Sequence, residues 1–329
     1  MLVIVIIWLF VLMTYMLLSI TPGTGQTIIS AYDYGHRCYK NPSLTRIHYT
    51  STMILFLEAH ETSCYDRYDN GNMIALRSFN DGKTWSTPMS LRSKCKHTHS
   101  PQSFIYNNHT YIMYVCDNYG IAWRKLGNTT ISHEHYQKNL SNGLPIHIHS
   151  SGIVNPHTAA VNMPITIGEQ FMTLYSDDLV TWKTGARVPM IMSGTFEYSD
   201  NKTMLLQTQT IFKFNAIINS YDNGKTWSDI QTVYPFRRNK PAMIKHNDII
   251  YSISTDGLIT GSGLTIFIYK ISEQIWLHYY TIDTGASYDA SVVVMHDGNL
   301  MICYEKGWRS SIHCSVVAPY HGLMVPIDV

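Results

Sequence analysis

The sequence predicts an all-β fold, namely a six-bladed β-propeller of four-stranded antiparallel blades. A turn motif occurs at residues 78–85, 176–182 and 220–227, so one strand-turn unit is repeated along the chain. Polar strand openings recur at intervals of roughly 40 to 60 residues, which is the period of a four-stranded blade. Tyr, Trp and Ile alternate with polar residues, and no long helical periodicity follows residue 25.

Each copy of the turn motif predicts one β-hairpin. The third copy, residues 220–227, fits the pattern Ser-x-Asp-x-Gly-x-Thr-Trp fully. The first copy has its Asp one place late, and the second is one residue short and lacks the Gly. Asn-Gly and Asp-Gly tips suit left-handed turn positions, and the Trp that begins the next strand can fold back over the turn. We expect these motifs to stabilise turns.

Six strand openings supply the blade count. Each begins with polar or turn-forming residues and continues into an alternating apolar strand; they cover residues 39–44, 99–104, 157–164, 195–198, 238–243 and 287–292. The inner strands of a propeller converge on a central funnel, so the openings should face one pocket. That pocket is expected to contain Lys40, Asn41, His99, His157, Glu197, Arg238, Lys240, Tyr288 and Asp289.

The chain is expected to comprise a targeting segment, residues 1–25, and one propeller domain, residues 26–329. Residues 1–20 contain no charged side chain and are about long enough to span a bilayer. Small residues at positions 23–25 offer a cleavage site before Gln26. A cleaved signal peptide is slightly favoured over a retained N-terminal membrane anchor. Either one predicts the secretory pathway and a secreted, extracellular or lumenal domain, with membrane attachment if the anchor stays.

Cysteines and glycosylation sequons agree with that compartment. The chain has six Cys, and Asn-x-Ser/Thr sequons begin at Asn108, Asn128, Asn139 and Asn201. Cys303 and Cys314 flank a predicted hairpin around Gly307 and are close enough in sequence to pair across it. The remaining connectivity is open, and some cysteines could be free core thiols. No Cys-x-x-Cys pair occurs, so a zinc or redox site is not expected.

Charge excludes one large class of partner. A net charge of +1 with 14% charged residues argues against a nucleic-acid binder, which would concentrate Lys and Arg on one face.

Pairs of the form His-x-His occur at residues 97–99, 133–135 and 147–149 and could bind a metal. No third ligand stands at a recognised spacing, so we expect neither a metal nor a cofactor.

Longer segments resemble the sialidase family, and the turn motifs resemble its Asp-boxes. Residues 39–44 and 54–60 are similar to the sialidase opening Tyr-Arg-Ile-Pro-x-Leu, followed by Leu-Ala-Phe-x-Glu-x-Arg, at the family's spacing. Lys40 stands where the first Arg belongs, and His60 stands where the second conserved Arg belongs. Asp69, with Asp66 in reserve, falls where the family keeps its acid/base Asp.

The resemblance implies a catalytic set and a substrate-binding set. Residues 285–290 and 297–305 resemble the segment that carries the family's nucleophilic Tyr, which implies Tyr288 as nucleophile and Glu197 as its partner. A Tyr nucleophile suits a sugar whose anomeric carbon bears a carboxylate, whereas a carboxylate pair is the commoner glycosidase solution. Substrate contacts are expected from Lys40, Asn41, Glu58, His60, Arg237, Arg238 and Asp289.

The chain departs from the family at the arginines that bind the substrate carboxylate. Sialidases use three Arg, whose planar forks pair with a carboxylate bidentately. The first is replaced by Lys40. No Arg occurs between Arg187 and Arg237, where the second belongs, and the aligned residues 206–209 read Leu-Gln-Thr-Gln. None occurs between Arg238 and Arg309, where the third belongs.

Two functions therefore remain open. The first is a diverged sialidase-like glycoside hydrolase that acts on glycans carrying an acidic sugar, with Arg237, Arg238 and Lys40 as a replacement cationic cradle. The second is a catalytically inactive, lectin-like propeller that binds glycans. A third function, a polysaccharide lyase that uses Tyr288 and a His as base and acid on a uronate, is supported only by the presence of these residue types and by no sequence motif.

Structural roles compete at three of the candidate residues. Tyr288 could serve strand packing, Glu197 could be an exposed hairpin residue, and Asp69 lies within an obvious turn.

Overall fold

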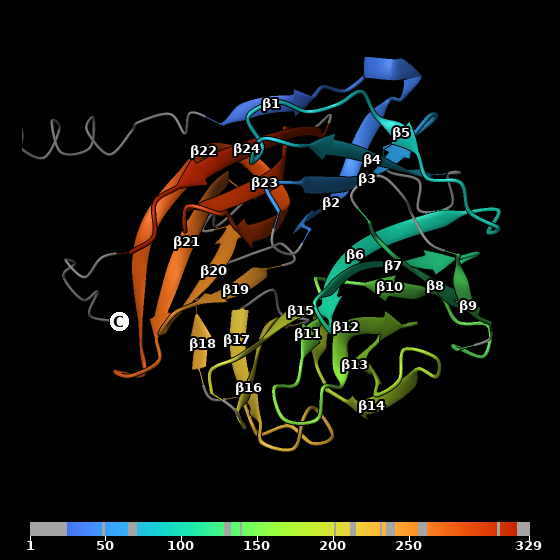
Figure 1. The fold of residues 1–329 in the computed structure, drawn as a ribbon. Helices are drawn as coiled ribbons and strands as arrows, with labels where there is room; N and C mark the ends of the chain where they lie inside the picture. The colour runs from blue at the N-terminus through green and yellow to red at the C-terminus, as the bar shows by residue number, and fades with distance from the viewer. Residues whose placement is uncertain are drawn as a thin grey trace, which may run out of the picture.

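The computed structural model describes eleven stretches of the chain (Figure 1). They are residues 25–47, 50–64, 71–127, 133–138, 140–200, 202–210, 215–230, 232–234, 241–255, 262–307 and 310–320. Within these stretches the regular structure is β, apart from one 3-10 turn, η1 (Asp33–Gly35). The prediction of an all-β fold is confirmed.

The strands form five antiparallel sheets, three of which have four strands in chain order. The first contains β2 (Cys38–Arg46), β3 (Met53–His60), β4 (Asn72–Ser78) and β5 (Met89–Ser90). The second contains β6 (Thr98–Tyr106), β7 (His109–Cys116), β8 (Gly120–Lys125) and β9 (His135–Gln137). The third contains β15 (Ile191–Tyr198), β16 (Met204–Thr210), β17 (Asn215–Ser220) and β18 (Thr232–Tyr234).

The two remaining sheets are larger. One contains β10 (Ile146–Ile148), β11 (Ile153–Val154), β12 (Val161–Ile167), β13 (Gln170–Ser176) and β14 (Lys183–Arg187). The other runs in the order β1 (Gln26–Ile29), β24 (Ser311–Val317), β23 (Leu300–Lys306), β22 (Ile275–Val294), β21 (Ser262–Lys270), β20 (Ile249–Thr255) and β19 (Ala242–His246).

The long strand β22 joins two blade-sized groups within the seven-stranded sheet. Its residues 275–286 pair with β21, and its residues 287–294 pair with β23. Figure 1 shows the sheets succeeding one another around a common centre, which is a propeller-like arrangement. Strand β1 pairs with β24, so the beginning and the end of the described chain share one sheet and close the ring. The number of six blades stays a prediction.

Apolar cores fill the spaces between neighbouring sheets. Phe104 and Trp123 of the β6–β9 sheet pack with Ile165, Leu174 and Trp182 of the next sheet and its loop. These side chains are almost fully buried. Burying one large apolar side chain stabilises a fold by about 1.5–3 kcal/mol, so alternation of apolar residues along each strand holds successive sheets face to face.

The three repeated turns share one hydrogen-bond pattern. In the third copy the Ser220 hydroxyl donates to Asp222 at 2.9 Å and accepts the Gly224 N–H at 2.8 Å. Asp222 in turn accepts the Thr226 N–H at 2.8 Å. The first copy makes the same bonds with Asn80 in place of an aspartate. Asn80 therefore takes the place of the motif's Asp in this copy, because its amide oxygen can accept the same hydrogen bonds. Asp81, one residue later, is not the equivalent residue.

Replacing Asp222 by Ala is expected to lower the free energy of unfolding by about 1–3 kcal/mol, since the Thr226 and Ser220 donors lose a charged acceptor. Burial alone would raise the pKa of Asp222, but the hydrogen bonds from Thr226 and Ser220 lower it. Urea unfolding measures the change, and Asp229→Ala, at an exposed position, is the matched control. Equal losses in the two variants would contradict a role for the turn network.

Three disulfides join the six cysteines, and none of these six is free. Cys303 pairs with Cys314 across the β23–β24 ladder, which confirms the predicted pairing. The others are Cys38–Cys64 and Cys95–Cys116. Disulfides persist mainly in oxidising compartments, so the three bonds are consistent with an extracellular protein. No helix among the described residues is long and apolar enough to cross a membrane.

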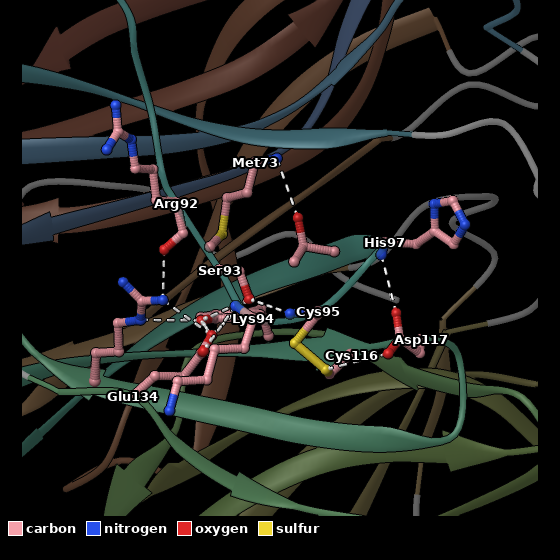
Figure 2. The surroundings of a disulfide bond; sticks show 12 residues. Met73, Arg92, Ser93, Lys94, Cys95, His97, Cys116, Asp117 and Glu134 are labelled. Atoms are coloured by element: carbon pink, nitrogen blue, oxygen red, sulfur yellow. Dashed lines mark hydrogen bonds and ion pairs between the residues drawn. A yellow bond between two sulfur atoms is a disulfide. The ribbon is translucent and has the colours of Figure 1, made fainter.

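A polar cluster lies beside the Cys95–Cys116 disulfide (Figure 2). Its centre is Glu134, which accepts hydrogen bonds from the Ser93 hydroxyl, the Lys94 N–H at 2.9 Å and the Tyr114 hydroxyl. The Arg124 guanidinium forms an ion pair with Glu134 at 3.0 Å. The cluster ties the segment before β6 to β7, β8 and the residues before β9.

Candidate functional site

Three of the predicted strand openings carry a bulge, in which two residues of one strand face one residue of the next. The bulged pairs are Asn41-Pro42 in β2, Ser100-Pro101 in β6 and Tyr288-Asp289 in β22. Proline has no N–H for a ladder, which explains two of the interruptions. Asn41 and Ser100 also have positive φ angles of 49° and 52°. Bulges re-aim side chains and are frequent beside functional sites, so these openings form the candidate site.

Lys40, Glu58 and His60 share one face of the β2–β3 pair. Lys40 is the register partner of Glu58, and residues directly opposite in an antiparallel pair point to the same side. His60 lies two residues further along β3 and so points to that side too. All three are at the end of the strands remote from the turn that joins β2 to β3.

Glu58 is a buried carboxylate with a partner on each oxygen. One oxygen accepts the N–H of Ser100 in the neighbouring sheet, and the other lies 3.3 Å from His60 Nε2. Burial alone would raise the pKa of Glu58. The hydrogen bond with His60, the positive field of His99 and His60, and the Ser100 N–H outweigh burial and lower the pKa to about 2. Glu58 is therefore a fixed negative charge over the whole physiological pH range.

His99 brings the second sheet into the site. Its Nδ1 lies 3.1 Å from the Ser100 hydroxyl, and its Nε2 lies 2.9 Å from the Asn118 side-chain oxygen. Its ring centre is 5.4 Å from that of His147 in β10. Both imidazoles are only partly buried. Two of the predicted His-x-His pairs thus meet in space, although no group of three or more possible metal ligands occurs among the described residues.

Lys40 is held by the segment that follows β3. Its ammonium group donates a hydrogen bond to the backbone carbonyl of Cys64, and Cys64 is disulfide-bonded to Cys38 in β2. The cation that stands in the place of the first family arginine therefore helps to fix this segment.

Tyr288 and Asp289 occupy the bulge of β22 and are partly buried. The residue facing them on β23 is Glu305, which is buried and accepts the Asn41 N–H at 2.8 Å. Asp283, earlier in β22, accepts from Lys306 at 2.7 Å and from the Tyr304 hydroxyl at 2.9 Å. Through Asn41 and Glu305, the β22–β23 end of the ring is joined to β2.

Five of the predicted site residues lie outside the described residues, namely Asp66, Asp69, Arg237, Arg238 and Lys240. Their predicted roles stay predictions.

Glu197 does not lie where its predicted strand opening would place it. It is the penultimate residue of β15, next to the turn that leads into β16. It accepts the backbone N–H groups of Tyr198 and of Lys245 in β19, both at 2.9 Å. Burial raises the pKa of Glu197, and these two N–H groups and the Lys245 charge oppose the rise.

Tyr288, by contrast, is remote from the turn that joins β22 to β23. Equivalent strand ends share one face of a propeller, so Glu197 and Tyr288 are at opposite faces.

Gln207 occupies the region where the second family arginine belongs. It is buried, and its side-chain oxygen accepts a hydrogen bond from the Ser252 hydroxyl of β20. A neutral side chain therefore links two sheets at this position.

Solved structures share this fold. A Hadza microbial sialidase superposes with a TM-score of 0.76 at 13% identity, over 89% of this chain and 68% of that one. The NanB sialidase of Streptococcus pneumoniae gives 0.71 at 11% identity, over 89% and 70%. The sialidase of Trypanosoma rangeli gives 0.70 at 13% identity, over 91% of this chain but only 60% of that one. The chain therefore has a sialidase-like β-propeller fold.

Sequence comparison alone finds no such relation, because no family model and no curated protein matches the chain.

Proposed function

We propose that the chain is a lectin-like propeller that binds glycans carrying an acidic sugar and does not hydrolyse them. The observation that carries the proposal is the bond from Lys40 to the Cys64 carbonyl. The sialidase resemblance puts a carboxylate-binding arginine at residue 40, whereas this chain has a lysine that donates one of its three ammonium N–H groups to a backbone carbonyl. A lysine ammonium also offers no planar, bidentate fork to a carboxylate.

Two further positions support binding over hydrolysis. Gln207 is neutral and engaged with Ser252. Glu197 lies beside a turn in a different sheet, at the opposite face of the propeller from the Tyr288 bulge, so it is badly placed to take a proton from Tyr288. The sialidase fold and the partly buried His99, His147 and Asn118 leave a polar surface suited to sugar hydroxyl groups.

The second candidate is the glycoside hydrolase. Tyr288 favours it, because this residue lies in a bulge at the same end of the sheets as Lys40 and Glu58. Asp66 or Asp69 would then serve as acid/base, Arg237 and Arg238 would complete a cationic cradle, and Asn41, His60 and Asp289 would contact the sugar.

One experiment separates the two functions. The full chain, produced by secretory expression, is applied to an array of sialylated, uronate-bearing and neutral glycans, and is incubated with fluorogenic sialosides and uronides. Acid-selective binding without turnover is the expected result. Turnover that Tyr288→Phe abolishes would establish the hydrolase instead. Absence of both binding and turnover would overturn both functions.

The side chain of His99 is expected to contribute to glycan binding. Replacing His99 by Ala should weaken binding about tenfold, which corresponds to the loss of about 1.4 kcal/mol from one hydrogen-bonding contact group. His109→Ala is the matched control, since His109 is exposed at the beginning of β7. Affinities from biolayer interferometry check the prediction, and equal affinities for the two variants would contradict it.

A further inference from the structure

One inter-sheet contact pattern occurs twice around the candidate site. In the first copy, the Glu58 carboxylate accepts the N–H of Ser100, and the Ser43 hydroxyl accepts the N–H of Ser103 at 3.1 Å. Glu58 and Ser43 belong to the β2–β5 sheet, whereas Ser100 and Ser103 belong to β6.

The second copy lies between β22–β23 and β2. The Glu305 carboxylate accepts the N–H of Asn41 at 2.8 Å, and the Ser291 hydroxyl accepts the N–H of Leu44 at 2.9 Å. In both copies the two N–H groups are three residues apart on the receiving strand. In both, a Glu from the second strand and a Ser from the first strand supply the acceptors.

These inter-sheet contacts supply hydrogen-bond acceptors that the bulges need. Asn41 and Ser100 have positive φ and stand outside the ladder register, so their N–H groups need acceptors from elsewhere. All four acceptor residues are buried, with at most 5% of each residue's surface exposed. A buried carboxylate that accepts an N–H makes a stronger hydrogen bond than a neutral group does.

We infer that Glu58 and Ser43 form a two-point latch that positions the Ser100 bulge, and with it His99, for ligand binding. The resemblance to sialidases predicts Glu58 as a substrate contact, whereas the latch makes it a positioning residue. The latch of Glu305 and Ser291 acts in the same way on Asn41 and hence on Lys40. The two latches in sequence align three neighbouring sheets at the candidate site. The ligand-binding part of this inference rests on the proposed function.

Amide hydrogen exchange measured by NMR on the folded full chain tests the latch without any ligand. Glu58→Ala should reduce protection of the Ser100 amide about tenfold or more, because a hydrogen bond to a charged group is lost. Ser43→Ala should reduce protection at Ser103 and leave Ser100 less affected. Glu61→Gln, an exposed neighbour, should change neither amide.

Glu58→Gln keeps an acceptor oxygen with the same reach, so it is the second variant if Glu58→Ala does not fold. It should retain protection at Ser100, because its side-chain oxygen still accepts the N–H. Unchanged exchange at Ser100 in Glu58→Ala, or complete loss of protection at Ser100 in Glu58→Gln, would overturn the latch.

Glycan affinity then tests the functional half. Glu58→Ala should shift the His99 ring resonances, and it should weaken glycan binding about as much as His99→Ala does. The Glu58→Ala, His99→Ala double variant should have a glycan affinity little below that of either single variant. If the wild-type chain binds no glycan, the proposed function fails while the exchange result still decides the latch. Additive losses in the double variant would overturn positioning through His99.

Discussion

Replacing Glu134 by Ala is expected to lower the free energy of unfolding by about 3–5 kcal/mol, since breaking a buried ion pair leaves the partner charge uncompensated. Glu134 and Arg124 expose only 3% and 12% of their side chains, and their charged atoms are 3.0 Å apart. The same carboxylate accepts the Lys94 N–H and the Ser93 and Tyr114 hydroxyls. One substitution would leave four donors without their acceptor.

Chemical denaturation with guanidinium chloride measures the change, and Glu169→Ala provides the control. Glu169 is exposed in the turn between β12 and β13, so its loss removes one acidic side chain without opening a buried site. A loss below about 1 kcal/mol for Glu134→Ala, the range of an exposed ion pair, would contradict the buried cluster.

The same residue predicts a pH dependence with a definite sign. Burial alone would raise the pKa of Glu134, but the hydrogen bonds from Ser93, Tyr114, Lys94 and Arg124 lower it from 4.5 to about 2. A depressed folded-state pKa adds stability above the unfolded pKa and loses it as the pH falls through the folded one. The stability difference between wild type and Glu134→Gln should therefore shrink between pH 4.5 and 2.

Local patterns in the sequence predicted the strands and the turns well. The repeated turns depend on hydrogen bonds within a few residues, so their Ser, Asp and Gly positions are visible in the sequence. Cys303 and Cys314 could be paired for the same reason, because one hairpin separates them. The pattern requires an Asp and therefore matches Asp81, although the amide oxygen of Asn80 is the acceptor in the first copy.

Contacts between segments that are distant in the sequence could not be predicted in the same way. Glu58 and Ser100 are 42 residues apart, and Glu134 and Ser93 are 41 apart, so no local periodicity connects them. The six-fold repeat places Glu197 in a strand opening, residues 195–198, but the repeat does not say at which face of the propeller this segment ends. That depends on how each strand pairs with its neighbour.

Removing the Cys38–Cys64 disulfide by a Cys38→Ala, Cys64→Ala double substitution is expected to have the second-largest effect. The bond closes a loop of 26 residues, for which chain entropy predicts a loss of about 3.5 kcal/mol. The matched control removes Cys303–Cys314, whose separation of 11 residues predicts a loss of about 2.8 kcal/mol. Urea unfolding compares the two variants, and a larger loss for the control would contradict the loop-closure argument.

The Cys38–Cys64 loop also contains most of the candidate site on β2 and β3. It includes Lys40, Glu58 and His60, and Cys64 itself supplies the carbonyl that accepts from Lys40. Without the disulfide, that acceptor is no longer held against β2. The affinity of the folded double variant for acidic glycans should therefore differ from that of the wild type. The Cys303–Cys314 control should keep wild-type affinity when folded. Equal affinity in all three proteins would show that the disulfide supports stability alone and leaves the position of Lys40 unchanged.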